Sequence, residues 1–356
     1  MENQTMMQES SMEDSVERTA ANSKAARRNF SKLGFIYVAG IVVLYVLVYA
    51  IKQVILGLNP AILDDSDLSL LLLSILPMYL AVFPLIVVLL KKSVPAVKPR
   101  KRRMSAGQYI LALIVCIGLA YASNFVGILI TTIVGLIRQT TVDNSILSVA
   151  TNVSPITILL YMVILAPIME EFMFRKMIVD HTMQYGKGIS ILLSGLMFGL
   201  FHGNLNQFVY AFSIGCFLAF IYVRTGNLKI TISMHMFFNF MGGFVATNLL
   251  KYLHLDEYMA ALESGSDVGA AMSVIGDNLL AWGCYLLFVL FVFGTTITGV
   301  VLFIVFACQK RFRLTEDSPN ALAKGKRLSA VVLNPGMLIY ILFWVSMIGL
   351  QLMGVL

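Results

Sequence analysis

Two adjacent glutamates and an arginine interrupt an apolar stretch near the middle of the chain, VILAPIMEEFMFRKMIVDH at 163–181. Glu171 and Arg175 are four residues apart, so on a helix they can form an ion pair with a purely structural role. Glu170 points about 100° away from Glu171 on a helix. An ionisable group at membrane depth is costly unless it faces a partner or water. We therefore expect Glu170 to have a function.

Pro167 lies three residues before Glu170 in the same apolar stretch. Proline lacks an N–H group, so it leaves one backbone carbonyl of a helix without its usual donor and kinks the helix. In a membrane this is tolerated where neighbouring groups or water bond the free carbonyl. The sequence thus predicts a local irregularity beside the glutamates.

Two of the chain's four histidines also lie in apolar runs. SGLMFGLFHGNLNQ contains His202, and ITISMHMFFNFMGG contains His235 and Asn239. A spacing of four residues puts Phe198 and His202 on one helix face, and likewise His235 and Asn239. A single buried histidine is readily explained as a hydrogen bond to a neighbouring helix. A glutamate pair, two histidines and an asparagine on three spans at similar depth indicate a functional site instead.

The chemistry open to this set of side chains is hydrolysis. A buried carboxylate or an imidazole can take a proton from water while other groups stabilise the developing oxyanion. A neutral histidine and an asparagine amide are suitable donors, and an apolar chamber would keep one water from exchanging with bulk solvent. The sequence has no Gly-x-Ser-x-Gly and no His-Glu-x-x-His, which argues against a serine hydrolase and a zincin. A Glu/His/His metal site remains chemically open.

The composition identifies the environment of these residues. The chain is 58% apolar and 13% charged, with a mean hydropathy of +0.84, far outside the range of a soluble domain. Crossing a bilayer as a helix takes about 20 apolar residues. Candidate spans lie near 33–56, 68–90, 108–137, 155–174, 189–203, 207–223, 230–249, 280–307 and 331–354, of which 189–203 is the shortest. We expect an all-α, polytopic transmembrane bundle of eight or nine spans.

The basic residues are distributed very unevenly between alternate connections. With the N-terminus inside, 23 of the 26 Lys and Arg residues fall on the inner side, and only Lys52, Arg138 and Lys251 on the other. Cytoplasmic connections carry the positive excess, so the pattern predicts a cytoplasmic N-terminus in a plasma membrane. The basic segment KKSVPAVKPRKRR is better explained as facing anionic lipid than nucleic acid.

Segments outside the spans are predicted to be solvated. Residues 1–32 have few large apolar side chains and cannot bury enough surface to fold alone, so we expect a disordered cytoplasmic tail. The remainder, 33–356, is the transmembrane domain. Residues 250–278 are predicted to form a long acidic outer connection, and His181 and His254 to lie in solvated loops.

Three motifs in the middle of the chain resemble those of the CPBP family, the CAAX proteases and bacteriocin-processing enzymes, also called Abi or Rce1-like intramembrane endopeptidases. The family motifs EExxxR, FxxxH and HxxxN read here as EEFMFR at 170–175, FGLFH at 198–202 and HMFFN at 235–239. All three occur in the family's order without a substitution, and the resemblance covers a core from roughly 154 to 248. It implies a helical bundle around a conical cavity that is connected to the cytoplasm.

The resemblance also implies roles for individual residues. Glu170 and His202 would activate water, and His235 and Asn239 would stabilise the oxyanion. Glu171 and Arg175, together with Phe198, would support them. Members of the family are described as glutamic or metallo-type proteases; if a metal is present, its ligands would be Glu170, His202 and His235, with zinc the natural candidate. We expect no cofactor.

Two classes of function follow from these patterns. The first is an intramembrane endopeptidase that hydrolyses a peptide bond of a membrane-associated protein or peptide in the lipid bilayer, with substrates ranging from prenylated proteins to maturing peptides and bacteriocins. The second is a non-enzymatic membrane protein, such as a proton-coupled or ion transporter or an immunity scaffold, that uses the same buried polar residues. Transporters often contain paired repeats, whereas the polar residues here are concentrated in the middle third of the chain.

Overall fold

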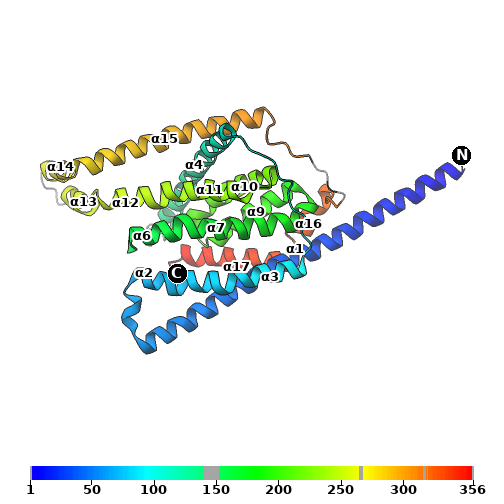
Figure 1. Ribbon diagram of the computed structural model, residues 1–356, viewed down its shortest axis with the longest axis horizontal. Coiled ribbons are helices and arrows are strands. Elements are labelled where there is room, and N and C mark those ends of the chain that lie inside the picture. Colours follow the sequence, from blue (N-terminus) through cyan, green and yellow to red (C-terminus); the bar gives the residue numbers. More distant parts are fainter. Residues whose placement is uncertain (1, 140–151, 264–267, 316–317, 319, 355–356) are drawn as a thin grey trace.

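The computed structural model describes residues 2–139, 152–263, 268–315, 318 and 320–354, and within this part of the chain every regular element is a helix (Figure 1). Eight helical segments are long and apolar enough to cross a membrane. They are Ala21–Leu58, Ser66–Ser93, Ala106–Arg138, Pro155–Tyr185, Leu205–Thr225, Leu228–Lys251, Leu279–Cys308 and Pro335–Leu352. The prediction of an all-α polytopic bundle is confirmed, and the chain is an integral multi-pass membrane protein.

The helical segments follow one another with few long connections. The first three spans comprise α1 (Glu2–Leu58), η1 (Pro60–Leu63), α2 (Ser66–Leu70), η2 (Leu71–Ile75), η3 (Met78–Val82), α3 (Phe83–Ser93) and α4 (Ala106–Arg138). The fourth comprises α6 (Pro155–Thr157), η4 (Ile158–Leu165), α7 (Ala166–Glu170), η5 (Glu171–Val179), α8 (Asp180–Thr182) and η6 (Met183–Tyr185). Then come α9 (Lys187–Phe201), α10 (Leu205–Thr225), α11 (Leu228–Asn239), η7 (Phe240–Val245), α12 (Ala246–Lys251), α13 (Leu255–Glu263), α14 (Val268–Asp277), α15 (Leu279–Cys308), η8 (Lys324–Lys326), α16 (Arg327–Val331) and α17 (Pro335–Leu352).

The ninth span that the sequence predicts near 189–203 is the short helix α9, which has 15 residues. Its length is about 22 Å, less than the roughly 30 Å of a hydrocarbon core. The chain reverses at Gly203, whose φ of +67° lies in the left-handed region, and Asn204 caps the start of α10. The end of α9 that carries His202 is therefore followed directly by α10, which packs against α9.

The predicted disordered tail differs from the structure. Helix α1 is continuous from Glu2 to Leu58, and its first half projects beyond one end of the bundle (Figure 1). Ala26 and Phe30 are already buried in the core, so the predicted boundary at 32 is wrong for this stretch. A segment of this composition cannot form a core of its own. Residues 1–32 contain no Gly or Pro and many good helix formers, so the first span can extend as helix without one.

The long outer connection also has regular structure. Residues 250–278 were expected to form a loop, but α13 and α14 pack against each other within it. Both helices lie at one end of the molecule, beside the start of α15 (Figure 1). The acidic and small residues that suggested a loop are compatible with short, exposed helices, because most of them have moderate to good helix propensity.

Two pairs of glycines allow the outer helices to pack closely. Gly34 on α1 meets Gly336 on α17, where a Cβ on Gly336 would overlap the carbonyl oxygen of Ser31. Gly118 on α4 meets Gly299 on α15, where a Cβ on Gly118 would lie 2.7 Å from the Gly299 Cα. Small residues at such crossings let backbones approach and are typical of helix packing in membranes. Gly299 is the only buried residue of α15, so α15 is attached to the bundle mainly through α4.

The basic connections gather at one end of the bundle. The segment after α3 bonds to the fourth span through Val97 N–H and the Asp180 carbonyl (2.6 Å), and to the end of α10 through Arg102 N–H and the Thr225 carbonyl (2.8 Å). The segment after α15 reaches the same end, where Leu322 N–H donates to the Tyr185 carbonyl (3.0 Å). The grouping expected from the charge pattern is thus present in the fold.

Candidate active site

The helix that carries the two glutamates departs from α-helical hydrogen bonding on both sides of α7. In η4 and η5 the bonds run from residue i to i−5, as in Ala166 N–H to the Tyr161 carbonyl. In this register Pro167 would bond to Met162, but proline has no N–H. The side-chain amide of Asn239 donates to the Met162 carbonyl instead, at 2.8 Å. The carbonyl that the sequence predicts to be freed by Pro167 is therefore bonded by a residue of the third motif.

Glu171 and Arg175 form the ion pair that their spacing predicts. The Arg175 Nη2 to Glu171 Oε1 distance is 2.9 Å, and both side chains are fully buried. The charge count placed Arg175 in an inner connection, which is wrong, because the residue lies inside the bundle. Its guanidinium stacks on the Phe198 ring, 4.2 Å from the ring centroid. Such stacking stabilises a desolvated arginine and links the first motif to the second.

His235 connects the two glutamates. Its Nδ1–H donates to Glu171 Oε1 at 2.9 Å, and its Nε2 lies 3.5 Å from Glu170 Oε2. The Glu171 side chain is 0% exposed, whereas that of Glu170 is 16% exposed. The neighbouring glutamates therefore face different surroundings, as their angular separation on a helix implies.

His202 follows the last residue of α9, and its orientation is fixed by its own helix. The ring Nδ1–H donates to the Phe198 carbonyl at 2.8 Å. A neutral ring that donates from Nδ1 has a free lone pair on Nε2. The Phe198 ring packs edge-on against His202, with centroids 4.8 Å apart, and against His235, with centroids 5.7 Å apart. Phe198 thus separates Arg175 from the two histidines and sets their spacing.

The four residues to which the resemblance assigns chemistry, Glu170, His202, His235 and Asn239, line one cavity of about 880 Å³. Phe198 lines it as well, whereas Glu171 and Arg175 lie behind its wall. α15 contributes a mostly aromatic and aliphatic wall on the far side. The other lining residues are Ala120, Tyr121, Ala122, Asn124, Phe125, Tyr161, Met162, Ala166, Asn206, Gln207, Tyr210, Ile214, Phe238, Gly242, Gly243, Ala246, Tyr285, Phe288, Val289, Val292, Phe293 and Thr296.

Neutral polar residues of the cavity were not predicted as part of the site. Gln207 donates from Nε2 to the Tyr210 hydroxyl at 3.0 Å, and Asn204 donates to the Gln207 side chain. The signal was present in the polar run NLNQ, which follows His202 directly in an otherwise apolar stretch. Tyr161 carried no such signal, because an isolated tyrosine in an apolar span is common at membrane depth.

A metal at this site would need Glu170, His202 and His235 as its ligands. Glu170 and His235 approach each other, but among the residues that the structure describes no three His, Cys, Asp or Glu side chains lie close enough to hold one ion. The arrangement does not fit the expected Glu170, His202 and His235 ligand set.

Of the two remaining histidines, one differs from expectation. His181 is buried in α8, where its Nδ1–H donates to the Met177 carbonyl at 2.6 Å. The prediction that it is solvated is wrong, because the segment after α3 and the start of α9 cover this end of the fourth span. His254 is exposed, as predicted, and lies 3.1 Å from Glu257.

Comparison with known proteins identifies the core. Residues 152–241 match the family model described as type II CAAX prenyl endopeptidase, Rce1-like. This part of the chain is similar to the CAAX-protease family. The match covers about a quarter of the chain and contains the three motifs. In the comparisons with curated proteins and with solved structures, nothing matches the chain. Helices α1, α3, α4, α15 and α17 lie outside the matched CAAX-protease core.

Proposed function

We propose that the chain is an intramembrane endopeptidase in which Glu170 and His202 activate the water that hydrolyses a peptide bond. The observation that carries the proposal is the convergence of Glu170, His202, His235 and Asn239 on one cavity, from two membrane spans and the short helix α9. Only one acidic side chain among the described lining residues faces this cavity, and it lies beside two histidines. This is the donor and acceptor set that water-mediated hydrolysis needs.

Glu170 and His202 both accept hydrogen bonds and so orient the attacking water. The Glu170 carboxylate accepts a hydrogen bond from one O–H group of the water, and the free Nε2 lone pair of His202 accepts a hydrogen bond from the other. As the water oxygen attacks the peptide carbonyl carbon, its first proton moves to Glu170. When the C–N bond breaks, Glu170 returns this proton to the departing amine. The carboxylate is regenerated, so atoms and charge balance over the cycle.

The oxyanion is stabilised by His235 and Asn239. One amide N–H of Asn239 is used by the Met162 carbonyl, which orients the amide and leaves its second N–H for the substrate oxygen. His235 donates from Nδ1 to Glu171, so it can donate to the oxyanion only from Nε2 as a doubly protonated ring. The Glu171 carboxylate orients the ring through Nδ1, and Arg175 holds Glu171 in place.

The cavity also constrains the substrate. Glu170 is its only charged side chain among the described lining residues, and the α15 wall presents Phe288, Val292 and Phe293. A charged group placed there would lose its hydration without a compensating partner. We therefore propose that the segment around the scissile bond is an extended, uncharged part of a membrane-associated protein or peptide.

The decisive experiment uses purified protein in liposomes and measures peptide cleavage and ion flux in parallel. We expect cleavage of an apolar peptide by the wild type and none by Glu170→Gln. Ion or proton flux without cleavage would contradict the proposal and favour a transporter that uses the same residues.

We expect the reaction to be independent of metal, because this assignment gives each motif residue a role without one. Metal content of the purified protein is measured by mass spectrometry, and cleavage is assayed after prolonged phenanthroline treatment. Activity should persist. About one zinc ion per chain, with activity lost on removal and restored by zinc, would contradict the metal-free mechanism.

A further inference from the structure

Two fully buried tyrosines from helices outside the CAAX-protease core lie side by side behind the active site. Tyr37 is on α1 and Tyr340 is on α17. Their rings pack edge to face, with centroids 6.2 Å apart. The crossing of Gly34 and Gly336 joins the same two helices close to these residues, so α1 and α17 present both tyrosines from one packed unit.

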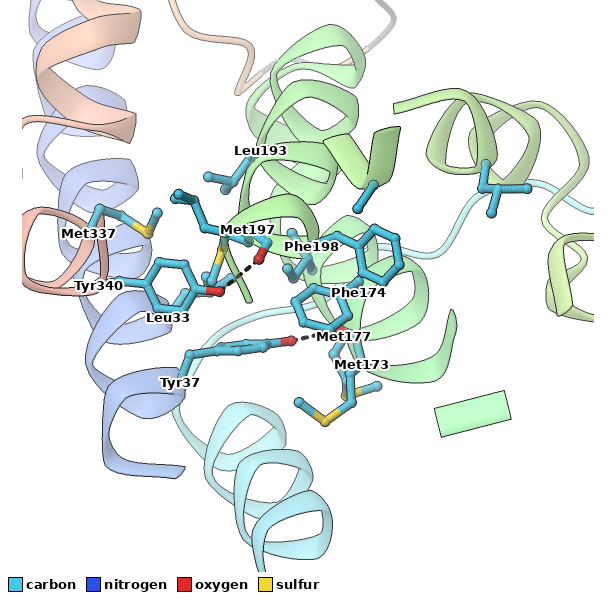
Figure 2. Close-up of a cluster of buried hydrophobic side chains, with 14 of the residues drawn as sticks. Leu33, Tyr37, Met173, Phe174, Met177, Leu193, Met197, Phe198, Met337 and Tyr340 are labelled. Carbon is cyan, nitrogen blue, oxygen red and sulfur yellow. Dashed lines mark hydrogen bonds between the residues drawn. The ribbon is translucent and has the colours of Figure 1, made fainter. Parts of the chain in front are cut away.

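Each tyrosine hydroxyl donates to a backbone carbonyl of a helix that carries a motif (Figure 2). The Tyr37 hydroxyl lies 2.6 Å from the Met173 carbonyl oxygen in η5, midway between Glu171 and Arg175. The Tyr340 hydroxyl lies 2.7 Å from the Met197 carbonyl oxygen in α9, directly before Phe198. The Met173 and Met197 carbonyls are therefore close to the place where the first and second motifs contact each other.

These bonds differ from ordinary helix contacts because their acceptors are main-chain atoms. A carbonyl has two lone pairs, so a hydroxyl can bond it in addition to its partner within the helix. Such a bond fixes the position of the backbone itself, whereas a packing contact fixes only a side chain. In a dry interior a lost partner leaves the hydroxyl or the carbonyl less well satisfied.

The two helices held in this way make the contact on which the site depends. Arg175 of η5 stacks on Phe198 of α9, and Phe198 in turn contacts the rings of His202 and His235. A small shift of α9 relative to η5 would move His202 relative to Glu170. Misplacement of reacting groups by about 1 Å can cost about 100-fold in rate.

We propose that Tyr37 and Tyr340 are positioning residues of the active site: through the Met173 and Met197 carbonyls they hold η5 and α9 at the separation that places His202 opposite Glu170. This inference rests on the proposed peptidase function. It gives α1 and α17, which the matched family core does not include, a direct part in the geometry of the site.

The test removes only the hydroxyl groups, in the full-length protein reconstituted in liposomes. Tyr37→Phe and Tyr340→Phe should each lower kcat about 3- to 10-fold, the effect of one hydrogen bond, with KM unchanged because neither residue lines the cavity. The double variant should lose less than the product of the single effects, since both tyrosines hold the same pair of helices.

Tyr185→Phe is the matched control. The Tyr185 hydroxyl accepts a bond from Asn29 of α1 at 2.6 Å, so its removal also weakens a buried hydrogen bond between α1 and the fourth span. Tyr185 lies at the end of η6, between the first and second motifs in the chain but outside both. Its variant should lose a similar amount of thermal stability and keep its kcat.

Hydrogen–deuterium exchange supplies a measurement that does not depend on activity. Tyr37→Phe should speed amide exchange over 173–179, and Tyr340→Phe over 197–203, whereas Tyr185→Phe should leave both unchanged. If kcat and exchange in the two tyrosine variants match the Tyr185→Phe control, the inference is wrong. A wild type that cleaves no peptide would overturn the proposed function instead, and the exchange result would still decide whether the tyrosines hold the two helices.

Discussion

Glu170 and Glu171 are neighbours in sequence, yet their carboxylates lie in different surroundings. One faces the cavity and approaches His235, and the other is sealed between Arg175 and His235. Because successive residues of a helix point about 100° apart, two adjacent acids can serve one site from two sides.

The first prediction compares amide substitutions at these two positions. Glu170→Gln should abolish cleavage, with a loss of about 100- to 10,000-fold, while its melting temperature stays close to wild type because the side chain is partly exposed. His202→Ala should behave in the same way. Glu171→Gln should lower the melting temperature, since it leaves Arg175 buried without a partner. Normal turnover in Glu170→Gln would exclude this residue as the base.

The second prediction separates the stability of the buried ion pair from its effect on activity. Arg175→Ala should destabilise the fold by about 3–5 kcal/mol, because it leaves the buried Glu171 carboxylate without its arginine partner. The double variant Glu171→Gln with Arg175→Met should recover much of that stability, as an apolar replacement of both partners often does. It should not recover cleavage, because His235 then lacks the carboxylate that orients it.

Denaturation in detergent and peptide cleavage measure these two effects in the same samples. Full activity in the double variant would show that the pair has only a structural role. The four-residue spacing of Glu171 and Arg175 was enough to predict an ion pair with a structural role from the sequence alone. Their contacts with His235 and Phe198 could not be predicted, because they depend on how three helices pack.

At the scale of elements, the irregular fourth span shows how local sequence and packing combine. Pro167 allowed a prediction that one carbonyl would lack its donor. The sequence could not reveal that the register is i to i−5, nor that Asn239 of a distant helix bonds Met162. A proline marks the place of the irregularity, and tertiary contacts decide how it is satisfied.

Periodicity and length described the long spans well and the short elements poorly. Helix α9 is too short to cross the membrane, and α13 and α14 occupy a stretch predicted to be a loop. Hydropathy measures only whether a segment prefers lipid. It does not report a helix that ends inside the bundle, such as α9, or a helix that continues beyond the bundle, such as the first half of α1 (Figure 1).

The third prediction concerns the crossing of α1 and α17. Gly336→Val should lower the free energy of unfolding by about 1–3 kcal/mol or more, the range for overpacking a closely packed site, since its side chain would overlap Ser31. Cleavage should fall as well, because α17 carries Tyr340. Gly349→Ala, on the same helix but with open space around the added methyl group, should leave both quantities unchanged. Equal melting temperatures for the two variants would contradict the close crossing.

At the scale of the whole molecule, the bundle has two chemically distinct ends. At one end, the basic segment after α3 bonds to the end of the fourth span and to the end of α10, and the basic segment after α15 bonds to the end of the fourth span. Lys251 lies at the other end, where it bonds to the Val153 carbonyl. The charge pattern predicted this grouping because the connections of the nine predicted segments alternate regularly between the two ends. Which end faces the cytoplasm remains a prediction from the positive-inside rule.

The last prediction tests that orientation by cysteine labelling in intact cells. The four native cysteines are first replaced by serine or alanine, and single cysteines are then introduced in place of Lys101 and Glu257. Lys101 lies in the exposed basic segment after α3, and Glu257 in the exposed helix α13 at the opposite end. With a cytoplasmic N-terminus, a membrane-impermeant maleimide should label Glu257→Cys in intact cells and Lys101→Cys only after permeabilisation. Labelling of Lys101→Cys in intact cells would invert the topology. The 23-to-3 charge asymmetry would then run against the positive-inside rule, and the basic end of the bundle would face the cell exterior.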